Sequence, residues 1–219
     1  MTSRFVKLRF VGKVKNGEVF DTNIAEEAKK IDLDIKNRPL VICLGQGMIL
    51  PALDDFLKDK MAGKYHLDLS PEKSFGQRKR ELIKTMPMSI FSKQNMHPHP
   101  GMVLNFDNMI AKISAVSGGR VIVDFNNPLA GKEIEYDLDL QEEVNDEKEK
   151  IKSLALFFFK KEIPFEVKDK NLVFSPIKED KSFEQIILLF KNKFKEILNL
   201  EVETKSEQKS ETKKEEKAD

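Results

Sequence analysis

The chain has 219 residues, which is enough for one large domain or two to three small ones. Charged residues make up 34% of it but nearly balance, and a net charge of +1 argues against a general nucleic-acid binder. Cys43 is the single cysteine, so a disulfide within one chain is excluded and we expect a reducing, cytoplasmic compartment.

The sequence predicts neither a signal peptide nor a membrane span. The first ten residues, MTSRFVKLRF, contain no long apolar segment after their charges. No other stretch approaches the length of a transmembrane helix. We therefore expect no membrane among the partners.

Residues 5–38 predict a β-hairpin followed by a polar segment. Residues 5–14, FVKLRFVGKV, alternate loosely between apolar and basic side chains, which is typical of a strand. The pair Asn16-Gly17 is a hairpin-turn signal, and residues 18–21 begin the return strand. A short helix is predicted at 25–31.

The central stretch, PLVICLGQGMILPAL at 39–53, predicts an apolar pocket. Residues 40–44 form an apolar run short enough for a buried strand, which Gly45 and Gly47 interrupt. Pro51 then suits the first turn of a helix at 52–56.

Leu50 precedes this proline and is therefore pushed away from helical geometry. Its N–H should lie outside the helix and point into the space that the neighbouring apolar side chains enclose. Downstream, residues 63–69 alternate as a further strand, and 70–76 form a turn-rich loop.

Three blocks of this sequence resemble the FKBP-type peptidyl-prolyl isomerases. They are VKLRFVGKVKNGEVFDT (6–22), PLVICLGQGMILPALDDFL (39–57) and AGKYHLDLSPEKSFG (62–76), in the order and at the spacing of the family. The closing strand, predicted at 132–140, comes late. The segment before it is similar to the inserted flap domain of the SlyD-like group, whose Asn-x-x-Leu-Ala-Gly return signal is matched by residues 126–131.

The resemblance implies an α+β fold in which an antiparallel half-barrel sheet wraps on a short helix, with a small β-rich insert and a small α/β C-terminal domain. This is the architecture of a long archaeal SlyD-like protein. The expected domains are an isomerase domain at 1–76 and 128–143, an inserted flap chaperone domain at 77–127, a C-terminal domain at 144–203 and a disordered charged tail at 204–219.

The resemblance also implies a pocket that catalyses rotation about X-Pro bonds by desolvation, without a cofactor. The residues that match the family's catalytic positions are Phe10, Phe20, Asp21, Ile49, Leu50, Phe75 and Tyr136, with Leu50 donating its N–H to a substrate carbonyl. The positions matching the rest of the substrate pocket are Leu40, Ile42, Met48 and Leu53.

Three positions depart from the family. Phe10 and Phe75 stand where many relatives have tyrosine, and Leu53 stands where a tryptophan is frequent. Asp21 is therefore expected to lack a phenol partner, and intrinsic activity is expected to be lower than in relatives that carry the hydroxyls.

The insert is rich in methionine and other flexible apolar residues, a composition suited to promiscuous binding. Strands are predicted at 103–106, 109–116 and 120–125. Packing within the insert's own core accounts for part of its apolar residues, and an exposed groove for unfolded chains would account for the remainder. The residues expected to contact such clients are Met86, Met88, Phe91, Met96 and Met102.

A metal site is not expected. His97 and His99, with a proline between them and only His66 elsewhere, are a poor ligand set. A solvent-exposed turn is the preferred interpretation of this segment.

Beyond residue 143 the pattern predicts a helix at 145–161, a hairpin formed by 164–167 and 172–174, and a helix at 183–198 capped by Ser182. The apolar run at 156–159 is expected to face the rest of the chain or a partner subunit, which leaves a homodimer through this region open.

The function predicted is a cytoplasmic prolyl isomerase with chaperone activity, whose partners are unfolded or proline-containing polypeptides. The alternative is a non-catalytic holdase or assembly chaperone that uses the isomerase fold only as a scaffold.

Overall fold

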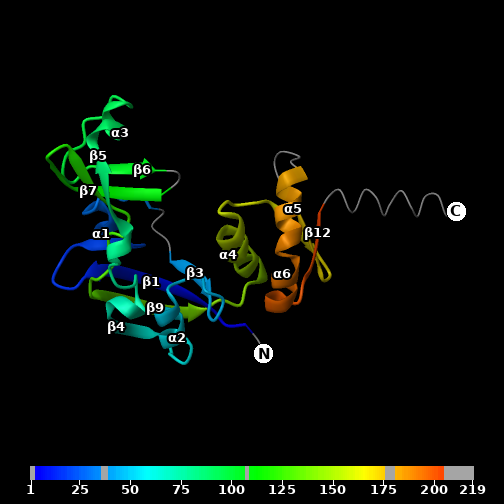
Figure 1. Cartoon of the computed structure of the whole chain (residues 1–219). Helices are drawn as coiled ribbons and strands as arrows, with labels where there is room; N and C mark the ends of the chain where they lie inside the picture. Colours follow the sequence, from blue (N-terminus) through cyan, green and yellow to red (C-terminus); the bar gives the residue numbers. More distant parts are fainter. Residues whose placement is uncertain (1–2, 36–38, 107–108, 176–180, 205–219) are drawn as a thin grey trace. The chain divides into compact units, whose positions relative to one another are not determined.

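The computed structural model describes residues 3–35, 39–106, 109–175 and 181–204 (Figure 1). The elements alternate strands with short helices, which confirms the predicted α+β class. The strands are β1 (Phe5–Val14), β2 (Val19–Thr22), β3 (Leu40–Cys43), β4 (Gly63–Leu69), β5 (Ile83–Pro87), β6 (Val103–Phe106), β7 (Met109–Ser117), β8 (Arg120–Asp124), β9 (Ile134–Glu143), β10 (Phe165–Lys168), β11 (Asn171–Phe174) and β12 (Glu201–Thr204). The helices are α1 (Ala25–Lys29), α2 (Pro51–Leu57), α3 (Met88–Ser92), α4 (Glu147–Phe159), α5 (Lys181–Leu189) and α6 (Lys191–Leu198), with 3-10 turns at Pro71–Lys73 and Arg80–Leu82.

The first sheet has the strand order β2-β1-β9-β4, and β3 pairs with β1 in addition. The pairing of β1 with β3 is antiparallel and sets Phe5 opposite Cys43 and Leu8 opposite Leu40. The predicted Asn-Gly turn follows β1: Asn16 has a φ of 55°, and Gly17 donates its N–H to the carbonyl of Val14 at 2.8 Å.

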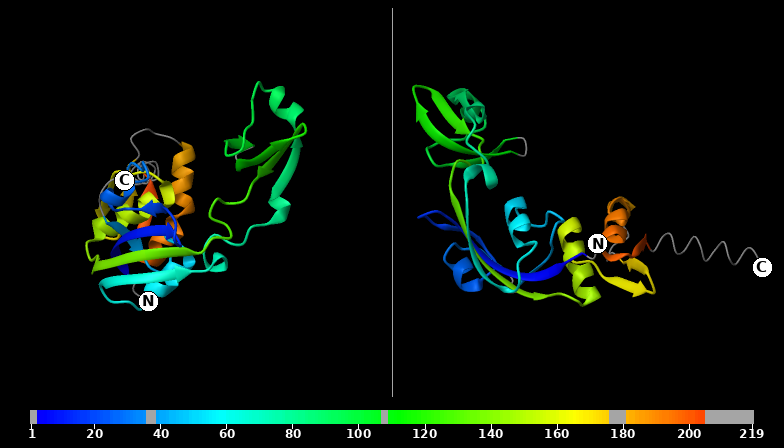
Figure 2. Two further views of the ribbon diagram at one scale, coloured as in Figure 1. Left: turned by 90° about the vertical axis from the view of Figure 1, so that its left-hand side faces the viewer. Right: turned by 90° about the horizontal axis from the view of Figure 1, so that it is seen from below.

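The insert is a four-stranded antiparallel sheet in the order β5-β8-β7-β6, with α3 following β5 (Figure 2). Three of its strands occupy the predicted positions within two residues, whereas β5 and α3 were not predicted. One face of this sheet is covered, and its buried core consists of Phe91, Ala111, Ile113, Val121 and Val123.

The C-terminal region combines α4, α5 and α6 with the sheet β10-β11-β12, in which β11 and β12 are parallel. Asp146 caps α4 by accepting the N–H of Glu149 at 2.7 Å. The predicted helix at 183–198 is two helices: Phe190 leaves helical geometry (φ −94°, ψ 1°) and its ring stacks on Phe158 at 4.6 Å.

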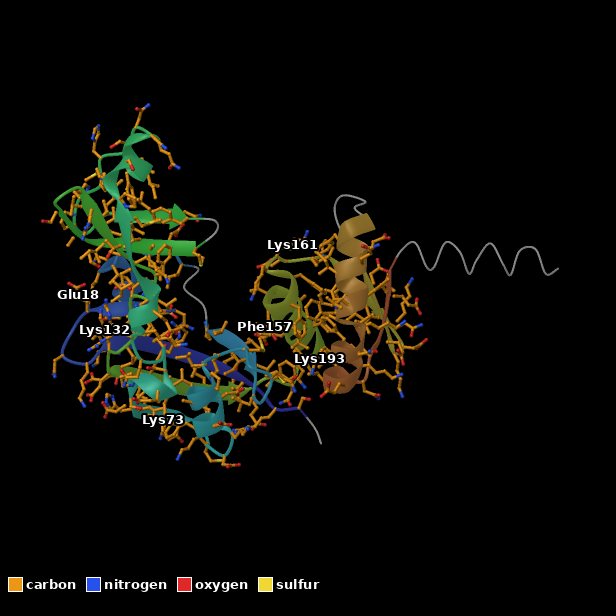
Figure 3. The ribbon with its side chains drawn as sticks, in the orientation of Figure 1. Glu18, Lys73, Lys132, Phe157, Lys161 and Lys193 are labelled. Carbon is orange, nitrogen blue, oxygen red and sulfur yellow. The ribbon has the colours of Figure 1, made fainter. Side chains whose placement is uncertain are left out.

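Aromatic packing explains the apolar run at 156–159. Phe159 is buried and lies within 6.0 Å, between ring centroids, of Phe174, Phe183 and Phe194. Lys161, labelled in Figure 3, places its ammonium 3.4 Å from the centre of the Phe183 ring. The run therefore serves mainly as the core of its own region.

The chain divides into two compact units, Met1–Val11, Thr22–Tyr65 and Asp137–Asp219 in the first, and Gly12–Asp21 and His66–Tyr136 in the second. In the first unit, Phe5 and Cys43 belong to the same buried core as the C-terminal helices. The second unit contains the insert together with the residues on either side of it in the sequence. None of the described helices is long and apolar enough to cross a membrane. The tail predicted from 204 onward lies almost entirely outside the described residues.

Candidate active site

Three aromatic rings from separate segments meet in the second unit. Phe20 lies on β2, Phe75 follows the turn at Pro71–Lys73, and Tyr136 lies on β9. Phe20 meets the other two edge-on, with centroid distances of 5.6 Å to Phe75 and 5.9 Å to Tyr136. Edge-to-face contact is a favoured geometry for aromatic pairs. We call these three residues the aromatic wall.

Gly12 lets the β1 backbone lie directly against the aromatic wall. A Cβ atom at this position would come within 2.8 Å of Tyr136 Cε1 and 3.0 Å of Phe20 Cζ. These separations are shorter than ordinary van der Waals contact between carbon atoms. Only glycine fits here without moving the rings.

Tyr136 supplies the aromatic wall with a phenol. Burial raises the pKa of Tyr136, and the negative charge of Asp21 raises it further, so the hydroxyl stays protonated over the physiological range. Although Phe10 and Phe75 carry no hydroxyl, a phenol therefore lies within electrostatic reach of Asp21. This relationship differs from the expectation that Asp21 would lack one.

In the first unit, Asp54 fixes the loop between β3 and α2. Its two carboxylate oxygens accept the N–H groups of Gly45 at 2.8 Å and Gly47 at 3.2 Å. Both glycines have positive φ, 80° and 66°, a conformation that other residues adopt only with strain. Asp54 is almost fully buried, so this loop is held rigidly.

Leu50 ends that loop with its backbone outside the helix, as predicted (φ −53°, ψ 135°). Its carbonyl accepts the N–H groups of Leu53 at 2.9 Å and Asp54 at 3.0 Å. No acceptor for the Leu50 N–H is found among the residues that the structure describes. The donor predicted for a substrate carbonyl is therefore open, and Ile49 beside it is half-buried.

The other predicted pocket residues of the first unit differ in burial and in the residues that they contact. Ile42 is fully buried and Leu53 is 4% exposed. The Met48 sulfur accepts the Cys43 N–H at 3.1 Å, and its side chain packs on the core shared with the C-terminal helices. Leu40 lines a cavity of about 490 Å³ beside α4. Met48 therefore packs against the C-terminal region, and substrate contact by Leu40, Ile42, Met48 and Leu53 stays a prediction.

Phe10 is held through its backbone by two residues that sequence reasoning missed. The Phe10 N–H donates to Asn23 Oδ1 at 2.9 Å, and the Phe10 carbonyl accepts the Thr22 hydroxyl at 2.7 Å. Asn23 Nδ2 reaches the Leu8 carbonyl at 2.8 Å. Such side-chain-to-backbone bonds explain why the segment after β2 is polar.

The apolar side chains that the insert exposes are not those predicted to contact clients, and they include Met109 at 56% exposure. Phe91 is fully buried, so we reassign it from client contact to the insert core. Met86, Met88, Met96 and Met102 are half-buried and pack on that core.

On the opposite side of the insert sheet lies an exposed surface that we call the insert face. The β-pairings set Val103 opposite Lys112 and Ile122 opposite Thr85 and Ala115, and residues that face each other directly share one side of a sheet. The large apolar residues of the insert face are Ile83, Val103, Ile110 and Ile122, exposed by 38%, 60%, 68% and 37%. Alternation along β7 was the sequence signal for this surface.

Comparison with known proteins shows which family the chain resembles. Residues 1–92 match the family model described as FKBP-type peptidyl-prolyl cis-trans isomerase. This N-terminal part of the chain is therefore similar to the FKBP-type peptidyl-prolyl isomerases. Residues 84–129 match a second model, described as the FKBP26 IF domain, and this range contains most of the insert.

The curated proteins that the chain resembles include archaeal and bacterial isomerases. The chain is 29% identical over 142 residues to the short-type peptidyl-prolyl cis-trans isomerase of Methanocaldococcus jannaschii, which covers 63% of this chain and 90% of that one. It is 28% identical over 141 residues to a probable FKBP-type 16 kDa isomerase of Pseudomonas fluorescens, covering 62% and 85%. It is 25% identical over 120 residues to the isomerase SlyD of Vibrio cholerae, covering 52% and 59%.

His97 and His99 are both exposed. His99 Nδ1 lies 3.2 Å from the Pro100 carbonyl. Within the described residues, no group of three or more histidine, cysteine, aspartate or glutamate side chains is arranged to hold a metal ion.

Proposed function

We propose that this FKBP-type isomerase acts on folding polypeptides, accelerating X-Pro rotation by desolvation while its insert binds the unfolded client. The observation that carries the catalytic part is the aromatic wall. Its Phe20 and Phe75 rings are half-buried, so part of their apolar surface is open to a proline ring.

The chemistry requires an environment rather than a reacting group. Rotation about a peptide bond costs about 18–20 kcal/mol because twisting destroys amide resonance. The twisted amide is less polar than the planar one, so apolar surroundings disfavour it less than they disfavour the ground state. Aromatic rings supply such surroundings. The family resemblance separately predicts that the Leu50 N–H donates to a substrate carbonyl.

The insert face supports the chaperone part of the proposal. Val103 and Ile110 expose large apolar side chains on one side of the insert sheet. Exposed apolar surface of this kind is typical of sites that bind other polypeptides. A client held there keeps its prolines at a raised concentration near the isomerase domain. With the C-terminal region beyond the insert, we propose a long SlyD-like form that works in the cytoplasm.

A second copy of the chain is a further proposed partner. Ile186, Leu188 and Leu189 on α5 are exposed by 42%, 37% and 75%. A dimer through α5 would cover these residues. Sedimentation of wild type and Leu189→Lys tests it: concentration-dependent mass that the substitution removes supports the dimer, and a monomer in both excludes it.

The rival function is a holdase that uses the fold without catalysis. An NMR exchange assay on an Ala-Leu-Pro-Phe peptide separates the two, with Phe20→Glu as the variant and Phe20→Leu as its apolar control. We expect exchange that Phe20→Glu removes and Phe20→Leu retains. Aggregation suppression without any exchange in the wild type would instead establish the holdase.

A further inference from the structure

Two chain segments, 76–82 and 124–131, join the insert to the aromatic wall within the second unit, and we call them the neck. At one end, the Gly76 carbonyl accepts the N–H of Gly131 at 2.8 Å. At the other, the Leu82 carbonyl accepts the N–H of Phe125 at 2.9 Å. The other hydrogen bonds between the two segments involve side chains.

Asp124 is the centre of this side-chain connection. It is 7% exposed, and its Oδ1 accepts both the Asn126 N–H at 2.9 Å and Asn126 Nδ2 at 2.7 Å. Its Oδ2 accepts a hydrogen bond from Arg78 Nη2 in the opposite segment. A buried carboxylate with all these partners fixes the groups around it, because separating any of them leaves charge uncompensated.

Asn126 extends the connection to the facing backbone. Its Oδ1 accepts the Lys79 N–H at 2.8 Å, and its Nδ2 donates to the Lys79 carbonyl at 3.0 Å. The amide thus imitates a neighbouring β-strand. Together, Arg78, Asp124 and Asn126 tie one segment to the other, and we call them the latch.

The latch lies on a continuous path from the aromatic wall to the insert core. Gly76 directly follows Phe75, whose ring contacts Phe20. Phe125 directly follows Asp124, and its ring lies 5.6 Å from that of Phe106 and packs on the insert core.

We propose that Asp124, acting through Arg78 and Asn126, is a positioning residue for isomerisation of protein substrates: it fixes the insert so that a bound client presents its proline to the aromatic wall. The inference rests on the proposed function of the insert. Linked binding sites raise the effective concentration only when their geometry permits simultaneous engagement, and a loose neck spreads the client over unproductive positions.

The test uses the full chain with Asp124→Asn and, because a buried change can unfold a protein, also Arg78→Gln at a side chain that is 55% exposed. Arg80→Gln is the matched control, since Arg80 lies in the same segment, is exposed and forms no ion pair with any described residue. Circular dichroism and melting confirm that each variant is folded.

Three quantities are measured for each variant: tetrapeptide kcat/KM, affinity for a permanently unfolded, proline-free polypeptide, and kcat for a proline-limited refolding reaction. We expect the latch variants to keep the first two within about twofold and to lose roughly tenfold or more in refolding kcat. Arg80→Gln should match wild type throughout. A purely structural role would instead lower all three together.

A chain whose insert is replaced by a short loop separates failure of this inference from failure of the proposed function. If that chain loses refolding catalysis while the folded latch variants retain it, the latch has no positioning role. The proposed binding of clients by the insert then still stands. If the shortened chain catalyses refolding at the wild-type rate, the proposed binding of clients by the insert is wrong. Loss of client affinity in the latch variants would likewise overturn the positioning role.

Discussion

The ring of Phe20 meets the ring of Phe75 edge-on, at 5.6 Å between centroids and 86° between planes. Phe20 comes from a hairpin strand and Phe75 lies more than fifty residues later, and Phe20 also meets the ring of Tyr136 edge-on. The proposed catalysis by desolvation requires that this cluster stay apolar.

Replacing Phe20 with glutamate should reduce peptide isomerisation to near the uncatalysed rate. A carboxylate in an apolar cluster is strongly desolvated, and it would hydrate the space that a proline must occupy. Phe20→Leu, which keeps the site apolar, should retain much of the activity. A protease-coupled assay measures both, and full activity in a folded Phe20→Glu variant would remove the aromatic wall from the mechanism.

Gly12→Ala should lower both stability and activity. The new Cβ would meet Tyr136 at 2.8 Å, and overpacking of this kind costs about 1–3 kcal/mol. Gly63→Ala on β4 is the control, because a Cβ there meets its nearest neighbour, the Tyr65 hydroxyl, at an ordinary 3.5 Å. Urea unfolding and peptide turnover check the pair. Equal behaviour of the two variants would contradict the close approach at Gly12.

Restoring hydroxyl groups should strengthen inhibitor binding. With Phe10, Leu53 and Phe75 in place of two phenols and an indole, we expect macrolide inhibitors of this family to bind more weakly than to its small members. Phe75→Tyr should recover part of the affinity by returning a donor. Calorimetry tests both statements, and nanomolar affinity in the wild type would contradict the first.

Acid should weaken the neck before it affects the aromatic wall. Burial opposes the charged form of Asp124, but hydrogen bonds from Asn126 and the charge of Arg78 outweigh it and hold the pKa of Asp124 below its usual value. Arg78 is its ion-pair partner, and Lys112 is its cross-strand neighbour on β7.

A group with a lowered folded-state pKa stabilises the protein above its unfolded pKa, near 3.9 for aspartate, and loses that contribution as pH falls through the folded value. The stability difference between wild type and Asp124→Asn should therefore be full at neutral pH and shrink below about pH 4. Thermal melts across pH measure this. A difference that is constant with pH would mean that the charge of Asp124 contributes nothing.

The sequence predicted those parts of the fold whose signals are local. The Asn16-Gly17 turn, the alternation of β1 and β7 and the proline at the start of α2 each determine structure over a few residues. It missed β5, which reads as polar, and β12, whose parallel pairing with β11 joins residues thirty apart. The sequence also predicted one helix where the structure has α5 and α6, because the break at Phe190 depends on stacking of its ring against Phe158.

The residues of the candidate site were predictable from the sequence, but the hydrogen bonds that hold those residues in position were not. The family resemblance indicated Phe20, Phe75, Tyr136 and the Leu50 N–H. The bonds from Asp54 to the glycine loop and from Asn126 to Lys79 join side chains to distant backbone, and no sequence period encodes them. The sequence likewise did not predict that Met48 packs against the C-terminal core, because this contact depends on tertiary structure.

The central claim is that the apolar pocket isomerises while the insert supplies clients, and it is tested most directly by replacing residues 77–127 with a short loop. Tetrapeptide turnover should stay largely intact, whereas catalysis of proline-limited refolding should fall by roughly two orders of magnitude or more, together with aggregation suppression. An equal fall in tetrapeptide turnover and refolding would contradict the account, because it would make the insert part of the pocket rather than a clamp for clients.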